Sequence, residues 1–167
     1  MKHEQSITLL NKAVADELQA VHQYMYFHFH LTDQGFMPLA MLFKQTAITE
    51  MGHVERLAER VLFLRGDVDM TAAGPVERIT DPAAILAKAM EMEDQSAKDY
   101  NQSALDCGAR ADAASKQIFE ALVADEEGHW DVFDKQLDNI KRFGPSYLAL
   151  QSFNAASAAP AKPGAAG

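Results

Sequence analysis

The sequence contains one cysteine, Cys107, among its 167 residues. A single thiol excludes an internal disulfide, a CxxC redox motif and a four-cysteine iron site. The chain also lacks any apolar run near the ~20 residues that would cross a bilayer. Its first residues carry one lysine and no apolar segment of the kind found in a secretory signal. We therefore expect a cytoplasmic protein that has no membrane partner.

Positive charge is scarce, because 15 Lys and Arg stand against 24 Asp and Glu, for a formal net charge of −9. Phosphates repel such a chain, which argues against nucleic acid as a partner. An acidic surface attracts cations, although solubility alone would also explain the charge. The length and the 48% hydrophobic content are those of one domain with a substantial core.

Glycine and proline stand at a few positions that divide the chain into long helical blocks. No segment shows the alternation of apolar and polar residues that marks a strand, so we predict an all-α fold. The predicted helices cover residues 6–33, 38–66, 82–108, 112–144 and, as a short fifth helix, 147–153. Short connections make two antiparallel hairpins, and the long 67–81 connection crosses part of the bundle. We predict an antiparallel four-helix bundle over residues 1–153 and a disordered tail rich in Ala, Pro and Gly over 154–167.

The apolar stripe of each long helix is interrupted near its middle by a glutamate. Residues that step by three and four along a bundle helix face the core. The four interrupting residues are Glu17, Glu50, Glu93 and Glu126. One reading is that they face water. Because buried, unpaired carboxylates are very costly, four coincident interruptions instead favour a cluster that surrounds positive charge.

The pattern Glu-x6-Tyr followed by Glu-x2-His occurs twice in the chain, 76 residues apart. In both copies the two glutamates are 33 residues apart. The first copy is Glu17, Tyr24, Glu50 and His53, and the second is Glu93, Tyr100, Glu126 and His129. Two hairpins related by a pseudo-twofold axis would bring the four glutamates and two histidines together.

These residue types suit a pair of metal ions. Residues three apart project from one face of a helix, so each Glu-x-x-His pair can bind the same or adjacent ions. Carboxylate and imidazole suit iron, manganese and zinc. Four carboxylates carry the charge that two divalent cations cancel.

The sequence resembles bacterioferritin over most of residues 5 to 153. The resemblance lies in residues 17–24, 50–53, 59–66 and 125–129, and in the ending Gly144, Tyr147 and Leu148. Ferritin-like di-iron proteins carry Glu on two helices and Glu-x-x-His on the other two. The fold implied by the resemblance is the ferritin-like four-helix bundle.

The resemblance implies a ferroxidase centre with two iron ions per subunit. It assigns one iron to Glu17 and His53, the other to Glu93 and His129, and both to the bridging Glu50 and Glu126. Tyr24 would be an outer partner that hydrogen-bonds a ligand carboxylate. The part played by Tyr100 stays open.

The resemblance also implies a hollow shell of twenty-four subunits built from dimers, with haem of the b type shared between two subunits. Met51 matches the position of the axial haem ligand. It follows Glu50 and therefore points about 100° away from the metal seam. Without the resemblance, Met51 reads as an ordinary packing methionine. A ferredoxin-type electron donor is the partner implied for iron release.

Some family members carry an extra inner iron site, whose positions here are Gln45 and Thr49. These are poor iron ligands, so we expect that site to be missing. His28 lies on the core stripe and reads as a satisfied core histidine, and Glu127 points off the metal seam. The remaining histidines, which we expect at the surface or an interface, are His3, His22 and His30.

The function predicted is iron storage and detoxification. Fe(II) would be oxidised by O2 or H2O2, and ferric mineral would accumulate inside the shell. One alternative is a di-iron oxygenase or peroxidase acting on an organic substrate, because such enzymes share this ligand set. Another alternative is a non-enzymatic bundle that carries haem or metal.

Overall fold

The computed structural model describes residues 3–144 and 146–158, and the regular elements of this part of the chain are all helices. They are α1 (Glu4–Asp33), α2 (Met37–Phe63), α3 (Pro82–Ala109), α4 (Ala113–Phe143) and α5 (Tyr147–Ala158). The predicted all-α fold with a short fifth helix is confirmed. No helix in the described ranges has the length and apolar character needed to traverse a membrane.

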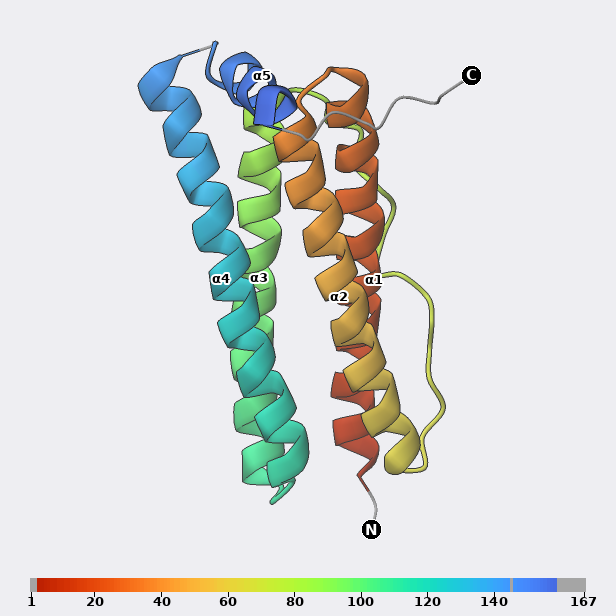
Figure 1. Cartoon of the computed structure of the whole chain (residues 1–167). Coiled ribbons are helices and arrows are strands. Elements are labelled where there is room, and N and C mark those ends of the chain that lie inside the picture. The colour runs from red at the N-terminus through yellow and green to blue at the C-terminus, as the bar shows by residue number, and fades with distance from the viewer. Residues whose placement is uncertain (1–2, 145, 159–167) are drawn as a thin grey trace.

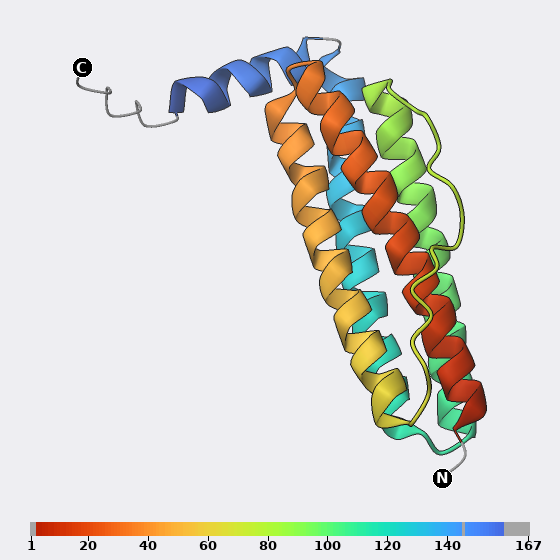
Figure 2. The same ribbon diagram turned by 90° about the vertical axis from the view of Figure 1, so that its right-hand side faces the viewer.

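The four long helices form two hairpins that lie side by side (Figure 1). Helix α1 packs mainly against α2, and α3 packs mainly against α4. The connection from α2 to α3 runs along the outside of the bundle and returns the chain to the end where α2 began (Figure 1). Helix α5 crosses that same end and projects beyond it (Figure 2).

The long connection is fastened to α1 by three side-chain amides, those of Asn11, Gln19 and Gln23. Each amide donates to one backbone carbonyl of the connection and accepts from one backbone N–H, at 2.7 to 3.1 Å. Gln23, for example, donates to the carbonyl of Glu77 at 2.9 Å and accepts from its N–H at 2.7 Å. The connection forms no regular helix or strand of its own in the described residues, and these amides satisfy part of its backbone. The N–H of Ala73 also donates to the carbonyl of Ala15 on α1, at 2.9 Å.

The helix ends follow local capping chemistry. Asp81 accepts from the backbone of Ala84 at 2.8 Å and Pro82 begins α3, the arrangement expected of an N-cap followed by proline. Helix α2 ends at Phe63 rather than at the predicted Gly66. Arg65 takes up a left-handed conformation with φ of 66° and turns the chain. Gly66 then lies so close to α1 that an added Cβ would sit 2.7 Å from Cγ2 of Ile7.

Helix α5 continues to Ala158, five residues beyond its predicted end at Phe153. The added turn contains three alanines, and alanine is the strongest helix former. The first part of the predicted disordered tail, residues 154–158, is therefore helical. Residues 159–167 of that tail lie outside the described residues.

The hydrophobic core is divided into two clusters along the bundle. The cluster nearer the start of α1 includes Leu10, Leu57 and Phe119. The cluster nearer α5 includes Phe27, Phe43 and Phe133. The four glutamates belong to neither cluster, so a polar layer occupies the middle of an otherwise apolar interior.

One position of the predicted stripe on α1 differs. Phe27 is fully buried, whereas His28 is half-buried at the edge of the core. The Nδ1 atom of His28 lies 2.8 Å from the carbonyl oxygen of Ala40 on α2. The core stripe of α1 therefore continues from Tyr24 to Phe27, three residues further on. The ring of His28 has its polar partner on the neighbouring helix α2.

Candidate metal centre

The four glutamates of the repeat lie in the middle of four different helices and point inward. At most 2% of Glu17, Glu50, Glu93 or Glu126 is exposed. The alternative reading that they face water is therefore wrong. Each is carried by a helix whose apolar residues, three and four positions away, fix the same face towards the core.

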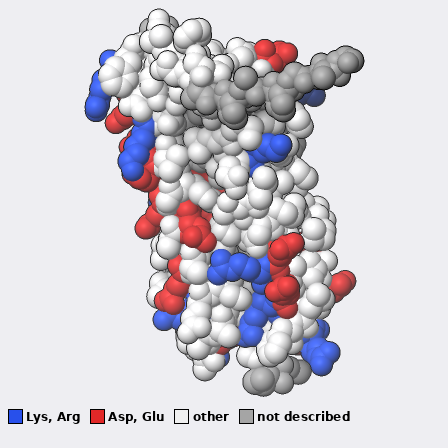
Figure 3. Space-filling view, in the orientation of Figure 1, with Lys and Arg blue, Asp and Glu red and all other residues white. Residues whose placement is uncertain are grey.

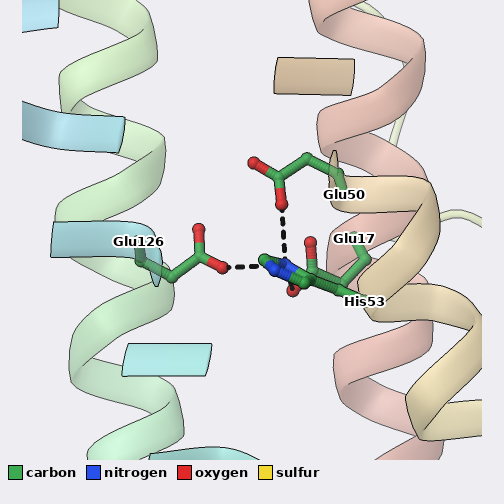
Figure 4. Close-up of side chains that lie close together, drawn as sticks. All are labelled: Glu17, Glu50, His53 and Glu126. Atoms are coloured by element: carbon green, nitrogen blue, oxygen red, sulfur yellow. Dashed lines mark ion pairs between the residues drawn. The ribbon is translucent and has the colours of Figure 1, made fainter. Parts of the chain in front are cut away.

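The first group of converging side chains consists of Glu17, Glu50, His53 and Glu126 (Figure 4). Nδ1 of His53 lies 2.8 Å from Oε2 of Glu50, 3.2 Å from Oε1 of Glu126 and 3.3 Å from Oε1 of Glu17. One ligand atom from each of the four residues lies within 4.8 Å of the others. This is a space that an ion can occupy in place of the imidazole proton.

The second group consists of Glu50, Glu93, Glu126 and His129. Nδ1 of His129 lies 2.9 Å from Oε1 of Glu50, 3.6 Å from Oε2 of Glu93 and 3.9 Å from Oε2 of Glu126. Glu50 and Glu126 therefore belong to both groups and face each histidine with a different oxygen. That geometry is the one a carboxylate needs to bridge two ions.

Both tyrosines of the repeat reach across to the other hairpin. The Tyr24 hydroxyl donates to Oε1 of Glu93, and the Tyr100 hydroxyl donates to Oε1 of Glu17 at 2.8 Å. Burial and the neighbouring carboxylates raise the pKa of both phenols well above the ordinary value. They are therefore neutral donors, and Tyr100, whose part the sequence left open, is placed as Tyr24 is.

Burial and mutual contact strongly perturb the ionisation of the cluster. Burial opposes charge on His53, but its contacts with Glu126, Glu17 and Glu50 outweigh burial and raise its pKa to about 12. The same balance raises the pKa of His129 to about 10, through Glu50 and Glu93.

The two shared glutamates shift in opposite directions. Burial raises the pKa of Glu50, but the contacts with His129 and His53 prevail and lower it to about 2. Burial and the neighbouring Glu93 raise the pKa of Glu126 to about 9. Without a metal ion, protons and imidazolium charges balance the carboxylates.

Most of the converging atoms have ion-pair neighbours but no hydrogen bond of regular geometry. They include both oxygens of Glu50, Oε1 of Glu126 and Nδ1 of each histidine. Buried polar atoms in native proteins are nearly always satisfied. Oxygen and imidazole nitrogen without thiolate suit iron, manganese or zinc. The residues therefore fit a pair of metal ions.

Asp125 joins the site although no spacing in the sequence singles it out. Its Oδ2 lies 3.2 Å from Nε2 of His53, on the side of the ring that faces away from the glutamates. Arg56 lies 3.7 Å from the same oxygen. Asp125 sits next to Glu126 on α4 and reaches a histidine of α2, and a contact between helices leaves no spacing signal in one sequence.

The remaining singled-out residues lie away from the two groups. His3 pairs with Asp112 at 3.6 Å, His30 packs its ring 4.3 Å from that of Tyr26, and His22 is exposed. Glu127 is exposed. At the Gln45 and Thr49 positions, the Thr49 hydroxyl donates to the Gln45 carbonyl at 3.2 Å.

Met51 lies on the outer side of α2, with 40% of its surface exposed. It lines an apolar groove of about 400 Å³ between α1 and α2, together with Val21, Met25 and Ile48. This placement keeps Met51 away from the metal groups.

The chain is similar to known proteins over most of its length. The ferritin-like domain matches residues 7–143. Bacterioferritin of Rhodobacter capsulatus is 35% identical over 145 residues, which cover 86% of this chain and 89% of that protein. The chain belongs to the bacterioferritin family. Bacterioferritin of Desulfovibrio desulfuricans is 34% identical over 143 residues, covering 86% of this chain and 80% of that protein.

Solved bacterioferritin structures share the fold. The R. capsulatus structure matches with a TM-score of 0.87 at 31% identity, covering 98% of this chain and 99% of that one. That structure has a metal-free dinuclear site and a haem iron in a crystallographic special position. The D. desulfuricans structure matches with a TM-score of 0.87 at 32% identity, covering 98% of this chain and 93% of that one. Iron storage is the function of this family and of the present chain.

Proposed function

We propose that this chain is a ferroxidase that binds two Fe(II) ions between its hairpins and stores the oxidised product. The supporting observation is that Glu50 and Glu126 each present one oxygen to His53 and the other to His129. Two positions that share two carboxylates suit two ions held together. Glu17 and His53 complete one position, and Glu93 and His129 complete the other.

The two Fe(II) ions are the substrate, and together they supply the two electrons that reduce O2 to H2O2 or H2O2 to water. The protein's part is to hold both ions in the polar layer between two apolar clusters. Tyr24 and Tyr100 fix the terminal glutamates through hydrogen bonds. Burial raises the pKa of Glu17 well above its ordinary value. Glu17 therefore releases a proton when the ions bind, as do His53, Glu126 and His129.

A groove of about 400 Å³ between α3 and α4 reaches two of the ligands, Glu93 and Glu126. Its wall also carries Asp94, Lys98 and Glu127. Ala97 and Trp130 are apolar members of the same wall. Organic substrates bind in mostly apolar pockets, whereas the four carboxylates of this groove suit the entry of a hydrated cation. The groove thus favours ferroxidase activity over the oxygenase alternative.

Haem binding is proposed for the opposite hairpin. Met51, in the apolar groove of α1 and α2, would hold the iron of a haem of the b type through its thioether sulfur, with one Met from each of two subunits. When bound, the haem would supply a redox-active iron at the subunit interface. The family also supports assembly into a 24-subunit shell. A ferredoxin-type donor for iron release stays part of the proposal.

The ferroxidase proposal is tested by stopped-flow oxidation of Fe(II) by the wild type and Glu93→Ala. Removal of a residue that hydrogen-bonds a metal ligand typically lowers activity by about 10–100-fold. Removal of a ligand itself, Glu93, should therefore slow Fe(II) oxidation by more than about 100-fold. Glu91→Ala, which removes an exposed carboxylate of the same helix, is the matched control. Equal rates for wild type and Glu93→Ala would support a non-enzymatic carrier instead, and size-exclusion chromatography of both variants checks shell assembly.

A further inference from the structure

The two metal positions have the same types of ligand, but the residues that contact those ligands differ. Each terminal glutamate receives one tyrosine hydroxyl from the other hairpin, Glu17 from Tyr100 and Glu93 from Tyr24. The carboxylates are therefore held alike on the two sides of the pseudo-twofold axis. Any difference between the positions must come from the histidines.

The ring of His53 has a carboxylate on the side that faces away from the glutamates. Its Nδ1 faces the glutamates, while its Nε2 lies 3.2 Å from Oδ2 of Asp125. The contact is an ion pair and not a hydrogen bond of regular geometry. With the Nε2 hydrogen on the side of this carboxylate, Nδ1 keeps a free lone pair for an ion. Arg56, 3.7 Å from the same oxygen, draws Asp125 towards α2. Only 3% of the His53 side chain is exposed.

His129 lacks this support. Asp125 stands four residues before His129, and the matching residue of the first repeat, four before His53, is Thr49. The Thr49 hydroxyl donates to Gln45 of its own helix at 3.2 Å. Among the described residues, carboxylates pair with His129 only through Nδ1, and 17% of its side chain is exposed.

We infer that the two positions bind metal unequally, with the tight one at Glu17 and His53 and the labile one at Glu93 and His129. A carboxylate that accepts the outer N–H of a ligating histidine orients the ring and raises its basicity, and its loss costs about 10–100-fold in metal affinity. The groove between α3 and α4 also reaches Glu93, so the weaker position is the one that exchanges its ion with solvent. The inference rests on the proposed two-metal centre.

The test is co-crystallisation of the metal-free protein with one Co(II) per chain, followed by anomalous diffraction. We expect Co(II) at Glu17 and His53 to exceed that at Glu93 and His129 by about tenfold or more. Asp125→Ala should bring the two occupancies close to equality by weakening the first position. Thr49→Asp should do so by strengthening the second. Asp131→Ala, which removes an exposed acid of the same helix, should leave the ratio unchanged.

Equal occupancy in the wild type would overturn the inference, as would an unchanged ratio in Asp125→Ala or in Thr49→Asp. These outcomes leave the two-metal centre intact. Absence of Co(II) from all six ligands would instead overturn the proposed function. Helix content and particle size of each variant confirm that it has folded and assembled.

Discussion

The hairpin of α1 and α2 and the hairpin of α3 and α4 are alike on the inside and different on the outside. Inside, each supplies one Glu, one Tyr and one Glu-x-x-His at matching positions. Four matching outer positions are Val21, Met25, Ile48 and Met51 on the first hairpin and Ala97, Asn101, Ala124 and Glu127 on the second. Figure 3 shows acidic side chains along the side formed by α4, and an uncharged area over the middle of α2 that gives way to charged side chains towards the end of that helix.

The difference shows which constraint acts on each surface. The inner faces must jointly cancel the charge of two ions, so neither hairpin can change its ligands alone. The outer faces have separate surroundings. One offers an apolar groove suited to haem and a second subunit, and the other offers a polar groove suited to cations.

The largest expected effect comes from removing a glutamate that both hairpins share. Glu50→Ala should weaken both positions, whereas Glu17→Ala or Glu93→Ala should each weaken mainly one. Calorimetric titration with Zn(II) should therefore show no tight ion in Glu50→Ala, one tight ion in Glu93→Ala and one more weakly bound ion in Glu17→Ala. Glu59→Ala, an exposed acid of α2, serves as control. Retention of one tight ion by Glu50→Ala would show that it does not bridge.

The second expected effect concerns only the outer face of the first hairpin. Met51→Leu keeps the apolar groove but removes the thioether sulfur, so purified protein should lose its bound haem, as measured by absorbance per chain. Met41→Leu, another half-exposed methionine of α2, should keep it. If Met51→Leu retains haem in full, the axial ligand lies elsewhere.

The third expected effect is a dependence of metal affinity on pH. The glutamates raise the pKa of His53 to about 12 and of His129 to about 10 despite burial, and burial raises that of Glu126 to about 9. At neutral pH these groups hold protons that an ion must displace. Zn(II) affinity should rise about tenfold per pH unit for each proton released.

Zn(II) titration in buffers of different ionisation enthalpy counts those protons directly. A pH-independent affinity with no proton release would contradict the predicted protonation of the metal-free cluster. Glu50 should contribute little to the count, because its lowered pKa of about 2 keeps it ionised.

The smallest expected effect compares the two tyrosines. Tyr24→Phe and Tyr100→Phe each remove one hydrogen bond to a buried glutamate, worth about 1.5–3 kcal/mol for a charged acceptor. Each should weaken Zn(II) binding by about 10- to 100-fold. Effects of similar size would support the pseudo-twofold relation. A loss confined to Tyr24→Phe would show that Tyr100 only fills space.

The sequence predicted the helices and the convergence of the six side chains because both depend on periodic spacing within single helices. It did not predict the end of α2, where Arg65 rather than Gly66 adopts the left-handed conformation. It also did not predict the support from Asp125 or the amides of Gln19 and Gln23 on the long connection. These contacts join segments that are far apart in the sequence. Their relative positions depend on how the helices pack, and no regular spacing within one sequence reveals that packing.

The central claim is that six side chains from four helices hold two ions per chain. Anomalous diffraction from crystals of the fully metal-loaded protein tests this claim most directly. We expect two peaks about 3.5–4 Å apart, as in two-metal sites, with Glu50 and Glu126 touching both. A single peak, or peaks that avoid these two glutamates, would contradict the claim.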